Sequence, residues 1–89
     1  MKAKEVVLLP RDNEGIHCRT DLGFSIDECV TAAASVGGDL RGDRFLIGYW
    51  PNAPPGCFIE ASDNAIHFNQ NSNGFNDGYF QPVCVREES

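Results

Sequence analysis

Four cysteines are the residues whose type and spacing carry the clearest chemistry: Cys18, Cys29, Cys57 and Cys84. Stretches of ten, twenty-seven and twenty-six residues separate them. An even number of cysteines without a close pair predicts a framework of two disulfides. The spacing disfavours structural zinc, whose ligands usually come in close pairs on tight turns. Two disulfides would imply an oxidising location, either outside the cell or in a lumen.

The run from Asn69 to Phe80 imitates part of a calcium-binding loop. The first, third, fifth, sixth and ninth positions of an EF-hand loop would be Asn69, Asn71, Asn73, Gly74 and Asp77. The twelfth position, which normally supplies a bidentate Glu, holds Phe80, and amides do not compensate the charge of the cation. We therefore expect an Asn/Gly-rich hairpin loop with no metal and no cofactor. A looser calcium site around Asp77 or Asp63 stays open.

The sequence shows no combination of residues typical of an enzyme active site. A thiolate nucleophile would leave an odd cysteine in the disulfide framework, and neither a G-x-S-x-G elbow nor a phosphate-binding glycine loop occurs. The neighbouring acids Asp27 and Glu28 are explained by helix capping. We expect no enzymatic activity and no catalytic residue. The tripeptide Arg41-Gly42-Asp43 falls in a predicted loop and is treated as a chance match to an adhesion signal.

Aromatic residues are numerous for so small a chain, with six Phe, two Tyr and one Trp. Several should therefore lie on the surface, where Tyr and Trp are enriched at interfaces. The alternative for Trp50 is that it covers the core. The predicted binding surface, for a protein or a glycan, combines rings beside turns with polar side chains of the following loop: Tyr49, Trp50, Phe75, Tyr79, Asn71, Asn73 and Asp77.

Length and charge limit the remaining classes. Eighty-nine residues predict one domain over 1–89. The net charge of −6 argues against nucleic acid and anionic membranes as partners. No apolar run approaches the ~20 residues of a transmembrane segment. The run Val6-Val7-Leu8-Leu9 is too short for the core of a signal peptide, so a targeting segment is expected to be absent from this chain.

A helix is predicted after Ser25. The Ser25-Ile26-Asp27-Glu28 sequence has the form of a capping box, and Gly37-Gly38 is expected to end the helix. One face of this helix is apolar at helical spacing: Ile26, Cys29, Val30 and Ala33. Cys29 should therefore point towards whatever the helix covers.

Short strands are predicted on both sides of the helix. Alternation of apolar and polar residues indicates a hairpin, 57–61 and 65–69, around a Ser62-Asp63-Asn64 turn. Strands are also expected at 6–9, at 45–50 as a buried strand, and at 79–85, where Pro82 predicts an edge position. The expected fold is α+β, with a small antiparallel sheet of four or five short strands, one helix packed on it and two disulfides.

The four cysteines permit three pairings. We favour Cys29–Cys57, which would join the helix to the hairpin, together with Cys18–Cys84, which would join the two ends of the chain.

The order of these elements resembles the PAN/Apple arrangement. The features that carry the resemblance are Glu28-Cys29 at the start of the helix, Gly56-Cys57 at the start of a strand, and a closing Cys84. The segment Pro54-Pro55-Gly56-Cys57 with Ile66-His67-Phe68-Asn69 also resembles small cysteine-containing modules of secreted and surface proteins from algae and other protists. The resemblance implies a helix bonded to the central sheet and a non-enzymatic module that binds protein or carbohydrate.

Overall fold

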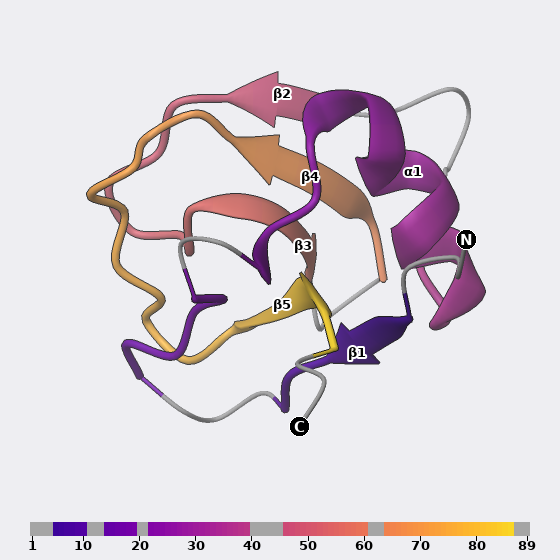
Figure 1. Ribbon diagram of the computed structural model, residues 1–89. Helices are drawn as coiled ribbons and strands as arrows, with labels where there is room; N and C mark the ends of the chain where they lie inside the picture. Colours follow the sequence, from indigo (N-terminus) through magenta and orange to yellow (C-terminus); the bar gives the residue numbers. More distant parts are fainter. Residues whose placement is uncertain (1–4, 11–13, 20–21, 40–45, 61–63, 87–89) are drawn as a thin grey trace.

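The computed structural model describes residues 5–10, 14–19, 22–39, 46–60 and 64–86. One helix packs on a five-stranded sheet with the strand order β1-β5-β3-β4-β2 (Figure 1). The elements are β1 (Val6–Leu8), α1 (Ile26–Ser35), β2 (Leu46–Gly48), β3 (Gly56–Glu60), β4 (Ile66–Asn69) and β5 (Phe80–Val85). The predicted α+β fold with a single helix is thereby confirmed.

The predicted hairpin lies at the centre of the sheet. Strands β3 and β4 are antiparallel, with Cys57 opposite Phe68 and Ile59 opposite Ile66. Ala61 at the end of the first predicted strand, and Ser62 and Asp63 of the predicted turn, lie outside the described residues. Asn64 adopts the left-handed conformation with φ of 61°, which asparagine tolerates better than most residues.

Strand β2 differs from the prediction, because it lies at an edge of the sheet and runs parallel to β4 (Figure 1). The chain reverses direction between β2 and β3 and again between β3 and β4. Two reversals return it to the direction of β2, so β4 inserts between β2 and β3 in a parallel pairing. The sheet is consequently mixed, and Ile47 is 46% exposed at this edge.

Strand β5 is wrongly predicted as an edge, since it lies between β1 and β3. Pro82 is tolerated there because of its place in the ladder. The last pair of β1 with β5 is Leu8 opposite Val83, and beyond it the Leu9 N–H donates to the Pro82 carbonyl at 2.9 Å. Proline cannot return that bond. The missing donor therefore falls just past the end of β1.

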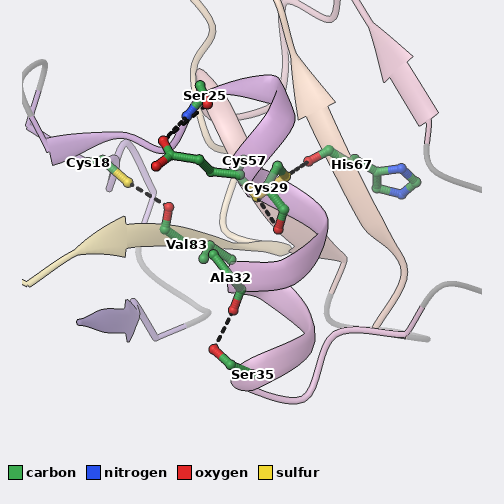
Figure 2. The surroundings of a disulfide bond; sticks show 9 residues. Cys18, Ser25, Cys29, Ala32, Ser35, Cys57, His67 and Val83 are labelled. Atoms are coloured by element: carbon green, nitrogen blue, oxygen red, sulfur yellow. Dashed lines mark hydrogen bonds between the residues drawn. A yellow bond between two sulfur atoms is a disulfide. The ribbon is translucent and has the colours of Figure 1, made fainter. Parts of the chain in front are cut away.

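Helix α1 begins and ends as predicted. The backbone N–H and the hydroxyl of Ser25 both donate to the Glu28 carboxylate, at 3.2 and 3.0 Å (Figure 2). At the other end, Gly37 has a φ of 97°, and the Gly38 N–H donates to the Ala33 carbonyl at 2.8 Å. Glycine adopts this left-handed conformation at little cost.

Both predicted disulfides are present, and they account for all four cysteines. Cys29–Cys57 joins α1 to β3 inside the core, and Cys18–Cys84 joins the segment before the helix to β5. The core lies between helix and sheet and is made of Phe24, Cys29, Ala32, Ala33, Cys57, Ile59, Ile66 and Val83. Two disulfides indicate an oxidising, secreted-type environment. Within the described ranges, no helix has the length and apolar character needed to cross a membrane.

Candidate functional site

The face of the sheet opposite α1 carries a cluster of rings. Successive residues of a strand point to opposite faces, so the positions between the core residues turn away from the helix. Phe58 lies opposite both His67 of β4 and Pro82 of β5, and Glu60 lies opposite Phe80. The sheet register alone thus brings two phenyl rings, an imidazole and a carboxylate to one face.

An open hollow of about 350 Å³ lies over these residues. Its lining comes from three strands and from the loops before β3 and β5: Trp50, Pro51, Asn52, Ala53, Phe58, Glu60, His67, Asp77 and Phe80. We refer to it as the aromatic hollow. Its volume falls within the range of about 300–1,000 Å³ that is usual for ligand sites.

The rings of the aromatic hollow support one another edge to face. The centroid of Phe58 lies 5.0 Å from that of Phe80 and 6.0 Å from that of Trp50, both with steep interplanar angles. His67 lies 5.3 Å from Phe58 and 5.8 Å from Trp50. Edge-to-face contacts are the preferred geometry of aromatic pairs. The walls are therefore held by ring packing and form a fixed apolar surface.

Asn69 holds the backbone of Trp50. Its amide oxygen accepts from the Trp50 N–H, and its amide nitrogen donates to the Trp50 carbonyl, each at 2.9 Å. Asn69 is only 2% exposed and also donates to the Ala53 carbonyl at 3.0 Å. Gly48 lies against the indole, and an added Cβ there would overlap the Trp50 ring. An asparagine and a glycine thus determine where the tryptophan sits.

The asparagine-rich loop is held by hydrogen bonds of its own side chains. The side-chain oxygens of Asn69, Asn71 and Asn76 each accept from the backbone N–H two residues further on, at 3.1, 3.0 and 2.9 Å. These three residues are buried, and such Asx turns are a common use of asparagine in loops. Across the described residues, no group of three or more His, Cys, Asp or Glu side chains is placed to hold a metal ion.

Two carboxylates and an imidazole are the ionisable groups among the described residues that line the aromatic hollow. The His67 Nε2 lies 3.6 Å from the Glu60 Oε2, and the exposed fractions of the two side chains are 12% and 38%. The Nδ1 of His67 is buried and makes no hydrogen bond within the described part of the chain. Asp77 is exposed, and its Oδ1 accepts from the Tyr79 N–H at 3.4 Å.

The structure does not bring all of the predicted surface residues together. Trp50 and Asp77 line the aromatic hollow. Tyr49, Phe75 and Tyr79 are exposed, at 70%, 55% and 69%, but they do not line it. Asn71 is buried in its loop, whereas the exposed Asn73 borders a different depression, beside His17 and Gly74.

Among the lining residues absent from the predicted surface, four carry a ring or a carboxylate: Phe58, Glu60, His67 and Phe80. The signal that could have found Phe58, Glu60 and His67 is the same period-two alternation that predicted the hairpin. It places these side chains on the face that the helix leaves uncovered.

No known protein family, curated protein or solved structure matches this chain. The resemblance to PAN/Apple domains accordingly stays a prediction.

The Gly48→Ala substitution tests how Trp50 is seated. The new methyl group would overlap the indole, so we expect the ring to leave the aromatic hollow at a cost of about 1–3 kcal/mol in stability. Because the chain has one tryptophan, its fluorescence reports this directly as a shift of the emission to longer wavelength. The control is Gly23→Ala, since a Cβ at Gly23 meets nothing within 4 Å. Unchanged emission from Gly48→Ala would contradict this placement of the ring.

Proposed function

We propose that this chain is a non-catalytic protein-interaction module, an accessory or structural part of a larger extracellular or lumenal assembly. The observation that carries the proposal is the aromatic hollow, in which the half-buried rings of Trp50 and Phe80 adjoin the buried ring of Phe58 on the face opposite the helix. Interfaces concentrate their binding energy on a few such buried aromatic anchors. The two disulfides favour an oxidising compartment for this assembly.

The chemistry of the other side chains supports a binding role over catalysis. All four cysteines are in disulfides and supply no thiolate nucleophile. The buried asparagines bond to backbone groups of their own loops. The PAN/Apple resemblance implies the same class of function.

Carbohydrate binding is the second candidate. It is favoured by one observation, a tryptophan beside two carboxylates in an open hollow, because sugars stack on rings and bond to carboxylates. The asparagine-rich loop argues against carbohydrate binding. The amides of Asn69, Asn71 and Asn76, which would be natural partners of sugar hydroxyls, are buried and already bonded.

The native mass of the protein tests the proposal. We expect the chain, extracted under mild conditions from its own source, to run far above its own 9.8 kDa. The Trp50→Ala variant, expressed in the same source, should run as a free chain while keeping both disulfides and the native far-UV circular dichroism. The control is Phe75→Ala, which removes an exposed ring outside the hollow. A wild-type chain that runs alone and binds glycans would reverse the order of the two candidates.

A further inference from the structure

We infer that the aromatic hollow binds an arginine side chain of a basic segment on the partner protein. This inference rests on the proposed function and specifies the chemistry of the partner. It is carried by the combination of ring walls and acidic side chains in one hollow, together with the charge of the whole chain.

The rings provide the first half of the recognition. Trp50 and Phe80 are half-buried rings of one hollow, and Phe58, which contacts both, is only 2% exposed. An aromatic face attracts a cation within about 6 Å of its centroid. Tryptophan is the strongest of these partners, and arginine is the cation most often found on it. The walls are fixed by their edge-to-face contacts, so a ligand would not have to order them first.

The carboxylates provide the second half. Glu60 and Asp77 both line the hollow, and among its lining residues that the structure describes none is a lysine or an arginine. The 3.6 Å between His67 Nε2 and Glu60 Oε2 is too long for a strong hydrogen bond, so the carboxylate retains acceptor capacity. A net charge of −6 also attracts basic partners from a distance.

The shape of the hollow favours arginine over lysine. Its guanidinium is flat, stacks on rings and presents paired N–H groups to a carboxylate, whereas a lysine ammonium is a compact and strongly hydrated charge. The hollow is broad and open, at about 350 Å³, and offers both a ring wall and acidic side chains to such a plane. The long methylene stem of arginine would lie against the remaining apolar lining.

The test compares two peptides on the wild-type protein. One is acetyl-Gly-Gly-Arg-Gly-Gly-amide, and the other carries citrulline, which keeps the shape of arginine without its charge. We expect the arginine peptide to shift the NMR signals of the Trp50 indole and the His67 ring in a saturable way. The citrulline peptide should bind about tenfold more weakly. Equal affinity for the two peptides, or no binding of either, would overturn the inference without requiring any variant.

Variants then assign the charge to its residues. Glu60→Gln and Asp77→Asn keep the shape of each side chain, and the Asp77→Asn amide would retain the oxygen that accepts from the Tyr79 N–H. Each substitution should weaken the binding of the arginine peptide severalfold. Asp27→Asn removes the same charge from an exposed position on α1, across the sheet from the hollow, and should change affinity by less than about twofold. Equal losses in all three variants would indicate a general effect of net charge and overturn the inference.

The two proposals fail in different ways. If Trp50→Ala abolishes the native assembly but the Glu60→Gln, Asp77→Asn double variant assembles normally, the hollow binds its partner by other chemistry, and only the arginine inference falls. If a soluble oligosaccharide displaces the arginine peptide or binds more tightly at the same signals, the glycan candidate replaces both.

Discussion

Replacing Cys29 and Cys57 together by alanine should lower the free energy of unfolding by about 5 kcal/mol. The bond closes a chain separation of 28 residues, for which loop-closure entropy alone accounts for about 3–4 kcal/mol. Both half-cystines are buried, at 0% and 1% exposure, so their removal also leaves a cavity in the core. A domain of this size is stable by only about 5–10 kcal/mol. The variant should therefore be largely unfolded near 37 °C, as measured by urea denaturation under non-reducing conditions.

The matched comparison is the Cys18→Ala, Cys84→Ala variant. The disulfide that this variant lacks spans 66 residues. Chain entropy alone would therefore make this disulfide more stabilising than Cys29–Cys57, by less than about 1 kcal/mol. Cys18, however, is only partly buried and lies outside the core cluster. We expect the order to be reversed, with the Cys29–Cys57 variant the less stable. The opposite order would show that core packing around this disulfide contributes little.

The single variant Cys29→Ser leaves Cys57 as a free thiol in the core. We expect it to lose several kcal/mol, through the lost cross-link and a buried hydroxyl. The thiol should react with a maleimide only after unfolding. A fully native variant with a rapidly labelled thiol would contradict the burial of Cys57.

Local signals explain what the sequence predicts well. The helix follows from Ser25, Glu28 and the two glycines after it, all within one segment. The β3–β4 hairpin follows from alternation over neighbouring residues. The sequence leaves three disulfide pairings open, and the favoured one, which joins the inward-facing Cys29 of the helix to Cys57 of the hairpin, is present.

Strand order is less accessible, because it depends on contacts between distant segments. A proline such as Pro82 commonly indicates an edge strand. In this sheet β1 ends before the position that a Pro82 N–H would have to bond. The sequence of residues 46–48 does not indicate whether this strand runs parallel or antiparallel to β4. Both errors concern pairing, and neither concerns the presence of a strand.

The candidate site likewise has residues that local sequence predicts and residues that it does not. The sequence predicts Trp50 and Asp77 as surface residues, because residue type and position near a turn can indicate exposure. Phe58 and His67 join them only through sheet register, and Phe80 only through the position of β5. The calcium-like spacing of Asn69, Asn71 and Asn73 has another cause, because two-residue steps are also the spacing of successive Asx turns.

Asn69→Ala should remove about 3 kcal/mol of stability and release Trp50 from the aromatic hollow. The amide of Asn69 bonds to four backbone groups, which are the Trp50 N–H and carbonyl, the Ala53 carbonyl and the Asn71 N–H. Each buried backbone group left without a partner costs about 1–3 kcal/mol, reduced here because some will reach water once the loop opens. The two loops that Asn69 joins would separate.

Two readouts distinguish loss of this anchor from general unfolding. The emission of the single tryptophan should move to longer wavelength while the far-UV circular dichroism stays native, since the core and the Cys29–Cys57 disulfide lie on the face of the sheet that the helix covers. The arginine peptide should bind at least about tenfold more weakly, because the indole wall is gone.

The control for Asn69 comes from the same loop. Asn73 is exposed, so Asn73→Ala should change stability by less than about 0.5 kcal/mol and leave the emission unaltered. Asn69→Asp keeps an acceptor for the Trp50 N–H but loses the donor to the Trp50 and Ala53 carbonyls, and it places a charge in a buried site. It should resemble alanine more than the parent. If Asn69→Ala instead binds the arginine peptide normally with unshifted emission, Trp50 is held by its ring contacts alone, and the amide serves only the loop.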